Sequence, residues 1–152
     1  MQTALAALVT IIKEGMADFN QPYYVKSCYT GDPLQMPSFN TPSAAVIPMQ
    51  PSPVETVFVG EDNDTETFAI RFYQPATRGA GEAAEVAAGM TKLMAMCDRV
   101  KTLLRADPTF GGTYVSSAIK SINPMLPSVG ENNVYRTAEI IFEMKARRLW
   151  GS

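Results

Sequence analysis

The sequence predicts an α+β fold, in which an antiparallel or mixed sheet of four to five strands carries a long helix across one face, together with an N-terminal helix and a proline-rich extended arm. Three observations carry this prediction. Residues 82–106 repeat apolar side chains at helical spacing, residues 134–147 alternate along most of their length as a strand does, and seven prolines fall within residues 21–53. The chain therefore combines helices, a sheet and one irregular segment.

Length and composition predict a single domain, residues 1–152. The apolar fraction of 46% and the charged fraction of 18% are those of a soluble globular protein with a real core. We expect its parts in the order helix 2–19, proline-rich arm 21–53, hairpin 54–74, helix 82–106 and closing strands 113–147.

The N-terminal helix is predicted by apolar side chains that recur on one side of residues 2–19. They are Leu5, Leu8, Ile12, Met16 and Phe19. The arm that follows cannot be regular helix or central strand for long, because proline lacks an N–H donor and fixes φ. Its several tyrosines and other apolar residues are more than a disordered linker would carry. We expect an ordered arm that ends in a short edge strand around residues 44–49.

The hairpin is predicted from two strand-like segments, 54–59 and 67–74, with turn-forming residues at 60–64 between them. Alternation places Phe68, Ile70 and Phe72 on the core face, with Arg71 and Tyr73 on the other face. We expect Pro75 to end the second strand.

The long helix is predicted by an apolar stripe and by its stop signal. The stripe consists of Ala83, Val86, Ala87, Met90, Leu93, Met94, Cys97, Val100 and Leu104. Asp107-Pro108 ends the helix, because the residue before a proline is pushed out of the α region. Gly111-Gly112 then turns the chain into a strand at 113–122, which Asn123-Pro124 breaks. A turn at 130–133 leads to the final strand.

The final strand has two unlike faces. Ala138, Ile140, Phe142 and Met144 share the face expected under the long helix, whereas Ile141 is an apolar residue on the otherwise polar face. An apolar side chain among polar ones suggests a contact with a subunit or partner. The candidate interface comprises Ile141, Glu139, Glu143, Tyr135, Arg71 and Tyr73.

Composition argues against catalysis. The chain has no histidine, the commonest general base and metal ligand, and its net charge of −2 with a pI near 5.1 does not suit a general nucleic-acid binder. We expect no catalytic, cofactor-binding or metal-binding residue and no membrane span. Cys28 and Cys97, without a secretion signal, indicate a reduced cytoplasmic setting, with Cys97 a buried apolar residue.

Four motifs have more ordinary explanations. Residues 79–84 weakly resemble a dinucleotide-binding loop, and Asp62, Asp64 and Glu66 have the spacing of a calcium loop without its turn glycine. Glu139 and Glu143 share a strand face as an acid–base pair could, and residues 145–150 form a small basic-aromatic patch. We interpret these four motifs, in the order given, as a helix entry, a hairpin tip, a solvated sheet face and a polar strand end.

The order of elements and two C-terminal segments resemble a known family. After the helix, the proline-rich arm, the hairpin and the long helix come LLRADPTFGGTYVSSAIKSI and VYRTAEIIFEMKARR. Asp107-Pro108 with Gly111-Gly112, and Tyr135-Arg136 with the alternating strand after it, make the chain similar to the tail terminator and tail-completion proteins of tailed bacteriophages, which join head to tail at the neck.

This resemblance implies a structural virion protein and no enzyme or cofactor. Such a protein forms a homo-hexameric ring that caps the tail tube and offers a head–tail joining surface. Its partners would be the tail tube protein and the head connector or neck proteins, and DNA would pass without specific binding. It would be assembled in the host cytoplasm and reside in the virion. The alternatives are another neck or tail-completion protein, a host interaction protein, or a non-viral small α+β ligand-binding domain.

Overall fold

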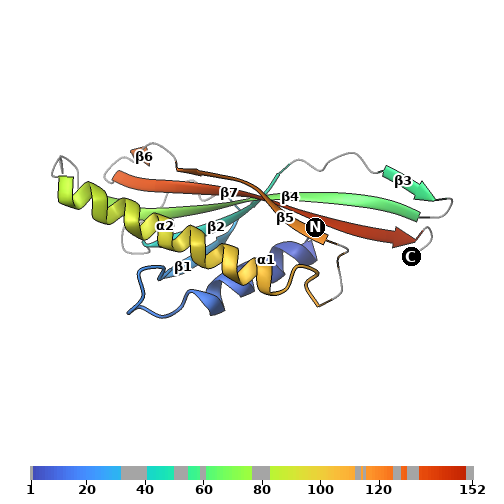
Figure 1. The fold of residues 1–152 in the computed structure, drawn as a ribbon, viewed down its shortest axis with the longest axis horizontal. Coiled ribbons are helices and arrows are strands. Elements are labelled where there is room, and N and C mark those ends of the chain that lie inside the picture. Colours follow the sequence, from blue (N-terminus) through green and yellow to red (C-terminus); the bar gives the residue numbers. More distant parts are fainter. Residues whose placement is uncertain are drawn as a thin grey trace.

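The computed structural model describes residues 2–31, 41–49, 55–58, 61–76, 83–111, 114, 116–124, 128–129 and 134–149. They form an α+β domain with two helices and a mixed sheet (Figure 1). The elements are α1 Gln2–Gly15, β1 Ser27–Thr30, β2 Ser43–Pro48, β3 Glu55–Phe58, β4 Glu61–Ala76, α2 Ala83–Ala106, β5 Ser116–Pro124, β6 Ser128–Val129 and β7 Val134–Leu149. The predicted α+β class is therefore confirmed, and the sheet is mixed instead of purely antiparallel.

The long strands β4 and β7 form the centre of the sheet. They pair antiparallel along all 16 residues of each, from Glu61 opposite Leu149 to Ala76 opposite Val134. The order across the sheet is β1-β2-β4-β7-β5, while β3 pairs with β4 and β6 with β7. Only β1 and β2, among the described strands, pair in parallel. Figure 1 shows one end of the β4–β7 ribbon extending past both helices.

The prediction of an edge strand at 44–49 is wrong. β2 lies between β1 and β4, because residues 27–30 supply a parallel neighbour on its outer side. Pro42 precedes this strand and Pro48 is its last residue, so the interior of the strand keeps its N–H donors. Within the proline-rich arm the described residues thus include two strands of the sheet, while residues 32–40 and 50–53 lie outside the described part.

The second strand of the predicted hairpin, β4, extends beyond its predicted bounds of 67–74 at both ends. The strand begins at Glu61, because the residues expected to form a turn pair with the end of β7; Asp62, for example, lies opposite Arg148. It also continues through Pro75. Tyr73 is the last residue of β4 that pairs with β2. Pro75 lies beyond it, so its missing N–H donor is tolerated.

The closing strand β5 also has shifted bounds. It begins at Ser116 instead of 113 and includes Asn123-Pro124, which the sequence suggested would break it. Pro124 is tolerated because β5 is the last strand in the sheet order. The pairing with β7 shifts register between Ile119 and Ser121. The turn expected at 130–133 lies outside the described residues.

The N-terminal helix ends four residues earlier than predicted. α1 stops at Gly15, which lies so close to α2 that a Cβ there would be 2.5 Å from Cδ1 of Leu103. Leu8, Ile12 and Met16 are fully buried as expected. Phe19 is 75% exposed, since the chain has left the helix before reaching it. The predicted apolar stripe was therefore wrong at this residue.

The core lies between the helices and one face of the sheet. Phe68, Ile70 and Phe72 of β4 are fully buried there, as is Ile140 of β7, so the predicted facing of both strands is confirmed. From α2 the core receives Leu93, Met96, Cys97, Val100 and Leu104. Met94 was expected on the same stripe but is 61% exposed. Instead Met96 is buried, and its Sδ accepts a hydrogen bond of 3.0 Å from Nε2 of Gln74.

The turn after α2 is held by its own aspartate. The Gly111 N–H donates to Oδ1 of Asp107 at 3.0 Å, and the Ser117 hydroxyl donates to the Pro108 carbonyl at 2.7 Å. Phe110 and Gly111 have positive φ values of 50° and 70°. This region of backbone space suits glycine and is costly for phenylalanine. The turn thereby directs the chain back toward β5.

Candidate functional site

The face of the sheet opposite α1 and α2 is the candidate site, and we term it the open face. Both helices contribute their buried side chains to the core on the other side of the sheet. Figure 1 shows the two helices together on that side. Strand alternation places on the open face the residues that do not enter the core. They include Thr137, Glu139, Ile141 and Glu143 of β7.

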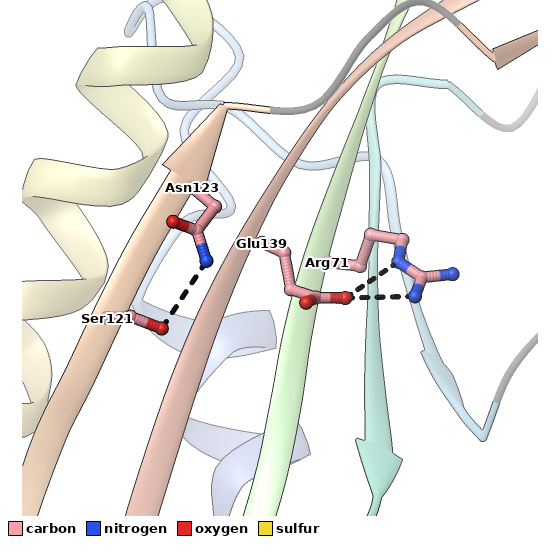
Figure 2. A network of polar contacts seen from close by, with 4 residues as sticks. All are labelled: Arg71, Ser121, Asn123 and Glu139. Atoms are coloured by element: carbon pink, nitrogen blue, oxygen red, sulfur yellow. Dashed lines mark hydrogen bonds and ion pairs between the residues drawn. The ribbon is translucent and has the colours of Figure 1, made fainter.

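An ion pair joins the two central strands on the open face (Figure 2). Arg71 and Glu139 are directly opposite in register, and Nε and Nη2 of the arginine donate to one carboxylate oxygen, Oε2, at 3.3 and 2.9 Å. Burial lowers the pKa of Arg71, but hydrogen bonds with Glu139 and Tyr73 outweigh that effect and raise the pKa above its ordinary value. The guanidinium therefore stays charged throughout the range in which proteins work.

Ile141 lies on the same strand, two residues beyond Glu139. It is half-buried, and its cross-strand neighbours are the small residues Ala69 on β4 and Ser121 on β5. Two residues further, Glu143 forms an ion pair with Lys120 at 3.6 Å. Ile141 is thus an apolar side chain between two ion pairs, over neighbours too small to cover it.

A small apolar cluster extends the open face toward β1 and β2. Ala45 and Tyr73 are buried there, and the half-buried Tyr29 and Ile47 pack against them. Small and aromatic apolar groups beside paired charges resemble the composition of protein interfaces, which have an apolar centre and a polar rim.

The structure brings together four of the six predicted interface residues: Arg71, Glu139, Ile141 and Glu143. Tyr73 shares their face but is only 7% exposed, so it supports Arg71 and has little surface to offer a partner. The side chain of Tyr135 lies outside the described residues; its backbone pairs with Pro75 and Ser128.

Sequence reasoning missed several residues of this face. Lys120 pairs with Glu143 because the register shift in β5 alters the alternation there. Next in the strand, the Asn123 side-chain amide donates a hydrogen bond of 3.4 Å to the Ser121 hydroxyl (Figure 2). Tyr29 and Ala45 arrive through the parallel pairing of β1 with β2. Neither a register shift nor a distant strand pairing has a local signal that could have revealed it.

The candidate catalytic and metal motifs lie in extended strands or outside the described residues. No group of three or more metal-ligating side chains occurs in the described part of the chain. Asp62, Asp64 and Glu66 lie in β4, an extended strand and not a loop. Glu66 is buried on the core side and accepts a hydrogen bond of 3.4 Å from the Tyr114 hydroxyl. Glu139 pairs with Arg71 and Glu143 pairs with Lys120. Residues 79–82 fall outside the described ranges.

The basic end of β7 lies beside an acidic segment. Arg148 is in register with Asp62, and Arg147 with Asn63, at the end of the sheet where Glu61 and Asp64 also lie. Trp150 of this predicted patch lies outside the described residues.

Both cysteines are buried, free thiols. Cys28 is 8% exposed and Cys97 5%, and burial raises the pKa of each thiol to about 11. A thiol with so high a pKa carries little reactive thiolate at neutral pH. The description of Cys97 as a small buried apolar residue is confirmed.

A second surface feature is a groove of about 250 Å³ between α2 and β5, which we term the α2–β5 groove. Its apolar lining consists of Met90, Leu93, Met94, Cys97, Ile122 and Ala138. Asp98 and Lys101 stand at its polar side, joined by an ion pair of 3.6 Å. The groove is thus an apolar hollow with one charged pair.

No helix within the described ranges is long and apolar enough to cross a membrane. Comparisons with protein-family models and with curated proteins found no match for this chain.

Proposed function

We propose that this protein is a structural subunit of a bacteriophage tail, a tail terminator that forms a ring, caps the tail tube and provides the head–tail joining surface. The observation that carries the proposal is Ile141, half-buried between two ion pairs on a face that neither α1 nor α2 covers. The resemblance of the C-terminal segments to terminator proteins supplies the biological setting.

The open face suits a protein contact for an energetic reason. A charge buried at an interface without a partner is costly, whereas Arg71 and Lys120 already have carboxylate partners within the subunit. Ile141 adds apolar area, worth about 25 cal/mol for each Å² removed from water. A neighbouring molecule can therefore cover this face without leaving these charges unpaired.

The ring would be a homo-hexamer in contact with the tail tube protein and with the head connector or neck proteins. DNA would pass through the channel without specific binding, in keeping with the net charge of −2. The same argument supports a neighbouring neck or tail-completion protein, which would share the virion location.

Electron microscopy of the purified protein and of tails assembled with it tests the proposal. Ile141→Glu should remove the rings or give tails of uncontrolled length while the circular dichroism spectrum stays that of the wild type. Thr10→Glu is the matched control, because Thr10 is exposed on α1, away from the open face. Normal rings and normal tails with Ile141→Glu would contradict a contact at this face.

The α2–β5 groove favours a second candidate function, a small α+β ligand-binding domain. Its lining is mostly apolar, as ligand sites are, although Asp98 and Lys101 are its only charged residues among those described. A thermal-shift screen with small apolar compounds separates the two functions, since a bound ligand raises the melting temperature with its concentration. A saturable shift without ring formation would favour the ligand-binding domain.

A further inference from the structure

Two apolar features lie on opposite sides of α2. Phe19, in the segment after α1, is 75% exposed. The α2–β5 groove contains Met94, which is 61% exposed. Removing large apolar side chains from water is favourable, and a group of them at such exposure usually marks a contact surface.

The chain around Phe19 contacts one side of α2. Nε of Arg99 donates to the Gly15 carbonyl at 3.0 Å, and the same guanidinium lies 4.8 Å above the centre of the Tyr23 ring. Gly15 also packs against Leu103. The segment that carries Phe19 is therefore held on the Arg99 and Leu103 side of α2.

The groove lies on the other side of the same helix. Met90 precedes Arg99 by nine residues, about two and a half turns at 3.6 residues per turn, so the two side chains leave α2 in opposite directions. Figure 1 shows α1 on one side of α2 and β5 on the other. Phe19 is therefore separated from the groove of its own chain by the width of a helix, about 10 Å.

We propose that Phe19 of one copy inserts into the α2–β5 groove of the next copy, so that the subunits join head to tail. This inference rests on the proposed ring, which it provides with a lateral contact distinct from the open face. A head-to-tail contact uses two different surfaces of the subunit, and repeating it closes a ring when the rotation permits.

The size and lining of the groove suit an aromatic ring. An apolar cavity of about 150 Å³ accommodates benzene, and the groove measures about 250 Å³. Methionine side chains such as Met90 and Met94 adapt their shape and make favourable sulfur–aromatic contacts. Aromatic residues that fill pockets commonly dominate the affinity of an interface.

Charge complementarity supports the same arrangement. Asp18 immediately precedes Phe19 and is exposed, with its Oδ1 accepting a hydrogen bond of 3.0 Å from the Asn20 N–H. That bond holds the turn that presents Phe19. At the groove, Lys101 pairs with Asp98, whose side chain is 72% exposed. Docking of Phe19 would bring the Asp18 carboxylate to this ion pair, where the Lys101 ammonium group would have to be shared between Asp18 and Asp98.

Self-association measured by analytical ultracentrifugation provides the first test. Phe19→Ser and Met94→Glu should each raise the dissociation constant at least about tenfold, which corresponds to about 1.4 kcal/mol. Thr10→Glu is the matched control, because Thr10 is exposed on α1 and belongs to none of these surfaces, and it should leave association unchanged. Unchanged association of Phe19→Ser, with wild-type circular dichroism, would overturn the inference.

Cross-linking between different variants provides the second test. Phe19→Cys and Met94→Cys are each combined with Cys97→Ala, because Cys97 lines the groove and could itself react, and are purified separately; Cys28 stays buried in both. Mixing the two under mild oxidation should give disulfide-linked dimers much faster than either variant gives alone, since the contact joins unlike surfaces. Faster linkage within Phe19→Cys alone would overturn the inference in favour of a symmetric contact.

These outcomes separate the inference from the proposed function. Rings that are lost with Ile141→Glu but kept with Phe19→Ser would overturn the Phe19 contact alone. A wild-type protein that remains monomeric at every accessible concentration would overturn both.

Discussion

Arg71 on β4 and Glu139 on β7 face each other directly in the antiparallel ladder, with two guanidinium nitrogens bound to one carboxylate oxygen. Their side chains are 26% and 20% exposed, so the pair is neither fully solvated nor deeply buried. It connects the two central strands of the sheet beside Ile141. A molecule that bound to this face would therefore meet two charges that are already paired with each other.

The contribution of this ion pair can be measured with a double-mutant cycle on Arg71→Met and Glu139→Gln. Cross-strand pairs of opposite charge typically contribute about 0.2–1 kcal/mol, so we expect a coupling energy in that range from urea unfolding of the four proteins. The coupling should shrink at high salt. A coupling of zero at low salt would show that the pair does not stabilise the ladder.

The facing of β7 predicts opposite outcomes for two adjacent residues. Ile140 is fully buried under α2, where an unpaired carboxylate costs several kcal/mol, so Ile140→Glu should unfold the domain. Ile141→Glu should shift the melting temperature little, because the side chain is only half-buried. Circular dichroism melting curves of both variants decide the matter. The reverse pattern would mean that the faces of β7 are exchanged.

The buried thiols predict a loss of stability at alkaline pH. The folded-state pKa of Cys28 and of Cys97 is about 11, above the ordinary value of 9.0. The folded chain therefore holds the thiol protons more tightly than the unfolded chain does. Their contribution to stability is full below pH 9 and is lost as the pH rises toward 11, at up to about 1.4 kcal/mol per pH unit for each thiol.

The measurement compares urea unfolding between pH 8 and pH 11 for the wild type and for Cys28→Ala with Cys97→Ala. The variant should lose less stability over this range than the wild type, although it starts lower because of the atoms removed from the core. Lysine and tyrosine titration affects both proteins alike. Parallel stability curves would contradict the role of the thiols.

The turn after α2 predicts a graded effect at Asp107. Its carboxylate accepts the Gly111 N–H at 3.0 Å, so Asp107→Ala should destabilise the domain by about 0.5–2 kcal/mol, as the loss of other capping side chains does. Asp107→Asn keeps an acceptor oxygen in the same place and should cost much less. Thermal unfolding of the three proteins gives the comparison, and equal losses in both variants would argue against the hydrogen bond.

Much of the fold was readable from the sequence because strand alternation and helical periodicity are local properties of the backbone. The facing of Phe68, Ile70 and Phe72, and of Ile140 against Ile141, follows from a period of two. From Met90 onward, where the side chains of α2 are described, the apolar stripe follows in the same way except at Met94, since a stripe has no sharp edge and the groove beside β5 leaves that side chain uncovered.

The tertiary structure decided what depends on residues far apart in the chain. β4 begins at Glu61 because β7 pairs with it there, β2 is interior because residues 27–30 pair with it, and α1 ends where Gly15 meets Leu103. The ion pairs of the open face and the opposed positions of Phe19 and the α2–β5 groove also arise from packing. The sequence by itself determined which side of each element is apolar, and only the assembled sheet determined which side has a neighbour.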